Sequence, residues 1–153
     1  MVPTLRELDM GNIVLSFNQF KDMIRLFASS ATLSALHLST IELGPEIFVF
    51  TSHTLPHLHL FTVRYQYLKI TLSPESQDHS ASGRTRPPTG QFIQAMKAHS
   101  FADWGLEHLR IKPLVFWPWT SCRHAIAEAF PNVKTFNGAS RKEYLSENYL
   151  DHI

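Results

Sequence analysis

A short pattern of apolar residues recurs along the chain. Leu5 opens the first copy, with apolar residues at positions 1, 4, 6 and 9 of a frame, and Leu33 opens a second copy 28 residues later that matches at all four positions. Looser copies open at Leu58, Leu106 and Val133. Alternate side chains of a strand point to the same face, so positions 4 and 6 should be buried together while positions 3, 5 and 7 face outward. Single copies arise by chance, but five at related spacing favour a repeat of short strands.

Between these strands the apolar spacing changes to that of helices. Ser16 and Gln19 form a capping-box pattern, and the apolar residues that follow predict a helix that ends near Ser29 or Ser30. Caps or apolar faces predict further helices over residues 44–52 and 91–102, from Thr120 or Ser121 to Pro131, and from Ser140 through Leu150. The segment 44–52 is ambiguous, because Ile47–Phe50 is β-prone, and its place in the repeat favours the helix.

The middle of the chain interrupts the repeat. Residues 64–72 alternate polar and apolar side chains and predict a strand, either an extension or an additional one. Residues 73–88 have almost no apolar side chains, so we expect a mobile loop over about 73–89. Leu58 and Leu106 are 48 residues apart, close to two repeat lengths. Whether the loop replaces or interrupts a repeat stays open.

Length and composition narrow the class of protein. The chain has 153 residues, of which 44% are hydrophobic and 18% charged, so it suits one folded domain over residues 1–153. Its formal charge of +1 gives no field that would attract nucleic acid or an anionic membrane. One cysteine excludes an intrachain disulfide, and the sequence offers no signal peptide or membrane helix. We therefore expect a cytoplasmic or nuclear protein.

The repeat spacing resembles that of leucine-rich repeats, whose L-x-x-L-x-L core is matched by Leu33–Leu38. Long helices between the strands favour the helix-bearing type of repeat. Together with phrases such as Phe130–Phe136, the chain resembles the irregular leucine-rich regions of fungal F-box-like proteins. The resemblance implies an α/β, leucine-rich-repeat-like solenoid, in which short parallel strands alternate with helices.

The resemblance also implies a function in protein–protein interaction. In that family the repeats recruit a substrate, and an amino-terminal F-box docks the adaptor of a cullin ubiquitin ligase. The repeat frame here starts at Leu5, which leaves no room for a helical F-box before it, so adaptor binding is assigned to no residue. Whether further repeats or an F-box domain are missing from this chain stays open.

The expected binding surface is the outward side of the strands, the concave face of such a solenoid. Its predicted residues are Glu7, Asp9, Ala35, His37, Leu60, Thr62, Arg64, His108, Arg110, Thr135 and Asn137. Their charge changes from acidic in the first copy to basic in later ones. Charges of this kind steer a partner and set its orientation, so we expect an unidentified protein partner.

Three histidines motivate an alternative, a small metal-dependent hydrolase. On a strand, His57 and His59 would face one side, as zinc ligands can, with His53 close in sequence. No nearby carboxylate completes such a site, and solvent-facing histidines are the simpler interpretation. Cys122 lies on the apolar face of its predicted helix, where a thiol is usually inert. We therefore predict a non-enzymatic chain with no catalytic residue, metal or cofactor.

Two further interpretations stay open. Trp117 and Trp119 flank Pro118, and tryptophans are enriched at the centres of protein interfaces. The same rings could instead close the core between a strand and a helix. A truncated paralogue without a selected function is the remaining alternative, and it would aggregate or stay partly unfolded when expressed alone.

Overall fold

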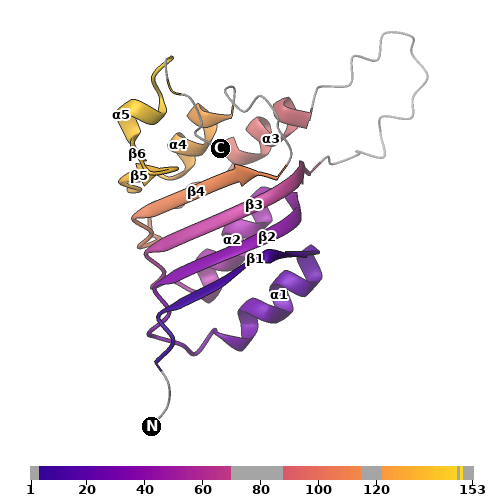
Figure 1. The fold of residues 1–153 in the computed structure, drawn as a ribbon. Helices are drawn as coiled ribbons and strands as arrows, with labels where there is room; N and C mark the ends of the chain where they lie inside the picture. The colour runs from indigo at the N-terminus through magenta and orange to yellow at the C-terminus, as the bar shows by residue number, and fades with distance from the viewer. Residues whose placement is uncertain (1–3, 70–87, 115–121, 148, 150–153) are drawn as a thin grey trace, which may run out of the picture.

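The computed structural model describes residues 4–69, 88–114, 122–147 and 149. They form an α/β fold around one open, mostly parallel sheet with the strand order β1-β2-β3-β4-β5-β6 (Figure 1). The strands are β1 Glu7–Leu15, β2 Ala35–Leu43, β3 Leu60–Leu68, β4 His108–Pro113, β5 Thr135–Phe136 and β6 Ala139–Ser140. The helices are α1 Phe17–Leu26, α2 Pro45–Thr54, α3 Pro88–Lys97, α4 Arg123–Ala129 and α5 Arg141–Tyr144. The predicted alternation of parallel strands and helices is confirmed.

The strands pair in the register that the repeat frame predicts. Leu36 pairs with Leu8 on one side and with Phe61 on the other, and Leu109 pairs with Phe61 and Phe136. Position 4 of all five copies therefore forms a single row across the sheet. The frame itself, read from the sequence, places these residues side by side.

Each of the strands β2 to β5 also begins with the same backbone contact to the strand before it. The carbonyl oxygen of Arg6 accepts from two successive amides, those of Ser34 and Ala35. The carbonyl of Ser34 accepts from the next pair of amides in the same way, and those of His59 and Glu107 repeat the arrangement. These four carbonyls occupy position 2 of the frame. Because the contact recurs at the same position, the turns that enter the strands share one geometry.

The core lies between the sheet and its helices. Helices α1 to α4 pack against one face of the sheet and follow one another in chain order (Figure 1). The buried side chains at positions 1, 4 and 6 of the middle copies include Leu33, Leu36, Leu38, Leu58, Phe61, Val63, Leu106, Leu109 and Ile111. Phe48 of α2 makes edge-on ring contacts with Phe61, Phe101 and Phe130, which joins the sheet to the helices.

Position 9 of the frame, although apolar, is not a core position. Ile13 is 53% exposed and Ile41 is 39% exposed. Strand alternation places Ile41 on the same side as positions 3, 5 and 7, away from the helices. In β1 the register shifts between Met10 and Val14, so alternation does not assign a side to Ile13. Ile41 therefore adds apolar surface to the side of the sheet that faces away from the helices.

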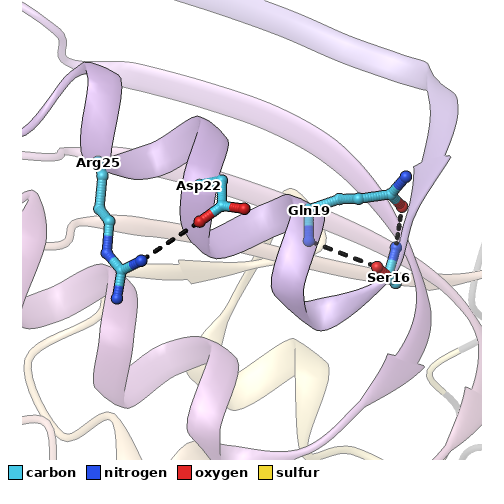
Figure 2. Close-up of polar contacts among 4 residues, drawn as sticks. All are labelled: Ser16, Gln19, Asp22 and Arg25. Atoms are coloured by element: carbon cyan, nitrogen blue, oxygen red, sulfur yellow. Dashed lines mark hydrogen bonds and ion pairs between the residues drawn. The ribbon is translucent and has the colours of Figure 1, made fainter.

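Helix α1 begins as the sequence predicts and ends earlier. The hydroxyl of Ser16 accepts from the Gln19 amide at 3.4 Å, and Gln19 Oε1 accepts from the Ser16 amide at 2.9 Å, so both halves of the capping box form (Figure 2). Asp22 and Arg25 make an exposed ion pair one turn further on (Figure 2). The helix ends at Leu26, three residues before the predicted end, because Phe27 leaves the helical conformation and caps it.

The ambiguous segment around Ile47 is helical. Gly44 caps α2, and Pro45 occupies the first turn, where its fixed φ favours a helix and its missing N–H costs nothing. Ile47, Phe48 and Thr51 bury one side of the helix, and Thr51 donates its hydroxyl proton to the Ile47 carbonyl. A connection between adjacent parallel strands needs a crossover element, and that requirement outweighs local β propensity.

The later helices differ from their predicted bounds. Helix α3 spans Pro88–Lys97 rather than 91–102, so the last two residues of the predicted 73–89 loop are helical and the remainder of that loop lies outside the described residues. Phe101 lies after α3 and is buried in the core, where its amide donates to the Ala129 carbonyl. Packing of Phe101 against α4 requires the chain to leave the helix first. The predicted strand over 64–72 is the second half of β3, which ends at Leu68.

Helix α4 is capped at Cys122, and the predicted caps Thr120 and Ser121 lie outside the described residues. Helix α5 was predicted to reach Leu150, but it ends at Tyr144. Its capping box, Ser140 with Glu143, forms as predicted.

The candidate binding face

The candidate site is the side of the sheet that faces away from the helices, which we call the open face. It consists of the outward residues of β1 to β5: Glu7, Asp9, Ala35, His37, Ser39, Leu60, Thr62, Arg64, His108, Arg110, Lys112 and Thr135. Strand pairing arranges them in rows. One row runs from Glu7 to Thr135 through Ala35, Leu60 and His108, and the next runs from Asp9 to Arg110 through His37 and Thr62.

Ser39 and Lys112 belong to a third row and are not among the predicted residues; Arg64 pairs with Ser39 on one side and with Lys112 on the other. Ser39 and Lys112 both occupy position 7 of the frame. The rule that positions 3, 5 and 7 face outward was sufficient to find them.

Asn137 does not lie on the open face with the other predicted residues. β5 ends at Phe136, and Asn137 and Gly138 form the turn to the antiparallel β6, with φ of 52° and 87°. Two successive residues with positive φ make the tight turn that closes such a hairpin. Asn137 Oδ1 accepts a 2.8 Å hydrogen bond from the Ile111 amide, so this side chain completes the backbone pairing of β4.

The acidic end of the open face is engaged within the protein. Glu7 Oε1 lies 3.2 Å from His37 Nε2 on the neighbouring strand. Asp9 Oδ1 accepts a 2.9 Å hydrogen bond from the Gly11 amide, which stabilises the irregular part of β1. Both carboxylates therefore have partners within the described part of the chain.

The side chain of Arg64 crosses the neighbouring strand. A Cβ atom on Gly11 would lie 3.5 Å from Arg64 Nη1 and 3.2 Å from Asp9 Oδ1. Between them, Ser39 is fully buried and donates a 2.6 Å hydrogen bond to the Gly11 carbonyl. The absence of a side chain at Gly11 allows this close approach. Arg64 of β3 and Asp9 of β1 therefore both lie near Gly11.

The basic end of the open face has no contacts of this kind in the part of the chain that the structure describes. Arg110 and Lys112 face outward on β4, two residues apart, and the described residues provide an ion-pair partner for neither. Arg110 is exposed and Lys112 is half-buried. The two cations of β4 are therefore charged side chains of the open face without an ion pair in the described ranges.

A polar cluster borders this basic end. Lys134 Nζ lies 3.0 Å from Glu107 Oε1. This hydrogen-bonded cation lowers the pKa of the Glu107 carboxyl, and burial acts in the opposite direction. His59 and His108 lower the pKa further. A 2.8 Å hydrogen bond joins His108 Nδ1 and Thr135 Oγ1. The cluster fixes the orientation of His108 beside the row that contains Arg110.

One polar atom at the centre of the open face is left without a partner. Thr62 is 6% exposed, and its Oγ1 has no hydrogen-bond partner among the described residues. His37 pairs with Thr62 from β2, and its Nε2 atom is also buried. Among the described residues, the charged group near this Nε2 is the Glu7 carboxylate. Uncompensated burial of a hydroxyl costs about 1–3 kcal/mol.

The histidines of the metal-hydrolase alternative do not lie on a strand. β3 begins at Leu60, so His57 and His59 precede it, and His53 belongs to α2; all three are exposed. Within the described part of the chain, no group of three or more His, Cys, Asp or Glu side chains could hold a metal ion. Cys122 is fully buried in the core, as predicted.

A pocket of about 370 Å³ lies outside the open face, between α2 and α3. Its polar lining includes Glu46 and Lys69, whose charged atoms lie 2.7 Å apart, together with Gln91 and His99. Val49 and Phe92 contribute apolar surface. Local sequence patterns do not indicate this pocket, because its two charged residues are 23 positions apart. The predicted hot-spot residues Trp117 and Trp119 lie outside the described residues.

No family model, curated protein or solved structure matches this chain. None of the helices in the described ranges is long and apolar enough to cross a membrane.

Proposed function

We propose that the chain is a protein–protein interaction module with a leucine-rich-repeat-like architecture, and that its open face binds the partner. The observation that carries this proposal is the set of registered rows of polar and charged side chains on a sheet face that no helix of the described ranges covers. Parallel sheets usually have both faces covered, so an uncovered face of this composition is available for a partner. The recurring backbone contact at position 2 and the irregular repeat lengths support the repeat architecture.

Substrate recruitment for an F-box-type ubiquitin ligase is the finer form of this proposal. It is supported by the resemblance of the repeat pattern and by the arrangement of the strands, in which each copy of the frame contributes one strand to a continuous surface. Such a surface would recruit a substrate protein while a separate F-box docked the ligase adaptor. The metal-hydrolase alternative receives no support from the positions of His53, His57 and His59.

The test is to block the open face and measure binding. A phage-displayed library of random dodecapeptides is selected on the folded chain, and the selected peptides are tested on two variants. Ala35→Trp places a large ring between Glu7 and Leu60 on the open face. Ala98→Trp places the same ring on an exposed site after α3 and serves as the matched control.

We expect Ala35→Trp to abolish binding of the selected peptides and Ala98→Trp to leave it unchanged. Circular dichroism of both variants verifies that the fold is retained. Peptides that bind Ala35→Trp as well as the unmodified chain would overturn the proposal, and so would a selection that yields no specific peptide.

A further inference from the structure

We infer that the partner contributes an extended acidic segment, which lies along β4 with carboxylates at alternate positions facing Arg110 and Lys112. This inference rests on the proposed function, because it names the chemistry of the partner of the open face. It depends on which charged side chains of the open face have contacts within the protein and which have none in the described ranges, which the row assignments alone do not give.

The carboxylates of the open face already have partners. Glu7 contacts His37, and Asp9 contacts the Gly11 amide and lies close to the guanidinium of Arg64. A partner with basic groups would have to compete with these contacts. Arg64 is likewise directed towards β1, so it is only partly available to a partner.

The cations of β4 have no such competition. Arg110 and Lys112 lack ion-pair partners in the described ranges, and Glu107, the nearest acidic residue in the sequence, is held by Lys134. A carboxylate that approaches either cation therefore gains an ion pair without breaking one. Charge complementarity at this end of the open face favours an acidic partner.

The spacing of the two cations specifies the form of the acidic segment. Residues two apart on a strand lie about 6.6 Å apart and point to the same face. An extended peptide has the same repeat, so its side chains at alternate positions match Arg110 and Lys112 in register. Adjacent carboxylates would point to opposite sides, and only one could face β4.

A nucleic acid is the less favoured anion. Its phosphates would meet Glu7 and Asp9 on the same open face, and the formal charge of the whole chain is only +1. A protein segment can limit its negative charge to the part that contacts β4. We therefore assign the basic end to an acidic peptide.

The experiment uses two labelled peptides of equal composition and measures fluorescence anisotropy with the full chain. The first has two glutamates at alternate positions among serines, and the second has the two glutamates adjacent, so that only one of them can face β4. The test variant combines Arg110→Glu with Lys112→Glu. The control combines Lys97→Glu with Lys142→Glu, which reverses two exposed cations outside the open face.

We expect the alternating peptide to bind the unmodified chain, and the reversal on β4 to weaken this binding by about tenfold or more. The control should bind like the unmodified chain, and the adjacent-glutamate peptide should bind about threefold more weakly than the alternating one. Circular dichroism and thermal unfolding verify that both variants fold.

Three results would overturn the inference: no saturable binding of the alternating peptide, equal loss in the control, or equal affinity for the two peptides. Tighter binding of a single-stranded uridine oligonucleotide, lost in the same β4 variant, would also overturn it in favour of nucleic acid. If library peptides are still blocked by Ala35→Trp in any of these cases, the proposed function stands and only the acidic partner is wrong.

Discussion

Arg123 Nη1 donates a 2.8 Å hydrogen bond to the carbonyl oxygen of Tyr144, which ties α4 to the carboxyl end of α5. The arginine is only 6% exposed, and its guanidinium also lies 5.3 Å from the ring centre of Tyr149. Buried arginines are rare unless they are paired, and here backbone carbonyls and aromatic faces take the place of a carboxylate. The contact holds the last described segment of the chain against α4.

We predict that Arg123→Met lowers the free energy of unfolding by about 2 kcal/mol, because the Tyr144 carbonyl loses a charged donor while the aliphatic part of the side chain is kept. Arg25→Met, which removes only an exposed ion pair with Asp22, should cost less than about 0.5 kcal/mol. Urea unfolding of both variants measures the difference. Equal effects would mean that the contact to α5 does not stabilise the fold.

The ring of Phe48 should be among the most important for stability. It is fully buried and contacts three other rings, from β3, from the segment after α3 and from the end of α4. Phe48→Ala should lower the free energy of unfolding by about 3–5 kcal/mol. Leu26→Ala, at a side chain that is 77% exposed, should change it by no more than about 0.5 kcal/mol. Thermal unfolding measures both variants. Equal loss of stability in Phe48→Ala and Leu26→Ala would contradict the described core.

The capping box of α1 gives a smaller, local prediction. Ser16→Ala removes the side-chain acceptor for the Gln19 amide (Figure 2) and should cost about 1 kcal/mol. Ser29→Ala is the matched control, because this exposed serine lies after the end of the helix. Hydrogen exchange should show faster opening of the first turn of α1 in Ser16→Ala alone. Unchanged exchange would exclude a role for this cap in helix stability.

The ion pair between Lys134 and Glu107 should be visible in the titration of the glutamate. Lys134→Met removes the cation that does most to hold the Glu107 pKa below its ordinary value, so the pKa should rise in the variant. A lowered folded-state pKa contributes stability above the unfolded-state pKa, and this contribution is lost as pH falls through the folded value. The difference in thermal stability between the two proteins should therefore disappear in acid.

Carboxyl-carbon NMR titration of Glu107 measures the shift directly. Lys97→Met is the control, because this cation lies at the end of α3 and is absent from the causes of the Glu107 shift. A Glu107 pKa that does not change on removal of Lys134 would refute the described pair.

Local chemistry predicted the starts of elements better than their ends. The caps at Ser16 and Ser140 form as expected, because a cap depends on residues three positions apart. The end of a helix depends on what the chain must contact next. The chain leaves α3 before Phe101, whose amide bonds the Ala129 carbonyl of α4. The ring of Phe130, at the end of α4, stacks on the ring of Phe101. Those contacts join distant parts of the sequence, so local spacing could not reveal them.

The candidate face shows the same division. Strand alternation in the sequence alone predicts that Thr62, Arg64 and Arg110 lie on one side of the sheet. It could not show that Asn137 turns away from that side to bond the Ile111 amide, since this requires the hairpin that follows β5. Nor could it show the pocket around Glu46 and Lys69, which depends on the packing of α2 against α3.

The sequence by itself determined the order and register of the parallel strands and, apart from Asn137, the predicted side chains that face away from the helices, because a period-two alternation and a recurring frame are properties of neighbouring residues. Only the tertiary structure decided the register shift in β1, the antiparallel β6 and which charged side chains of the open face have contacts within the protein. Arg64 reaches across β2 to the place where Gly11 leaves room, whereas Arg110 and Lys112 meet no carboxylate in the described ranges. Contacts between these side chains depend on distances across strands, and these distances exist only once the sheet has formed.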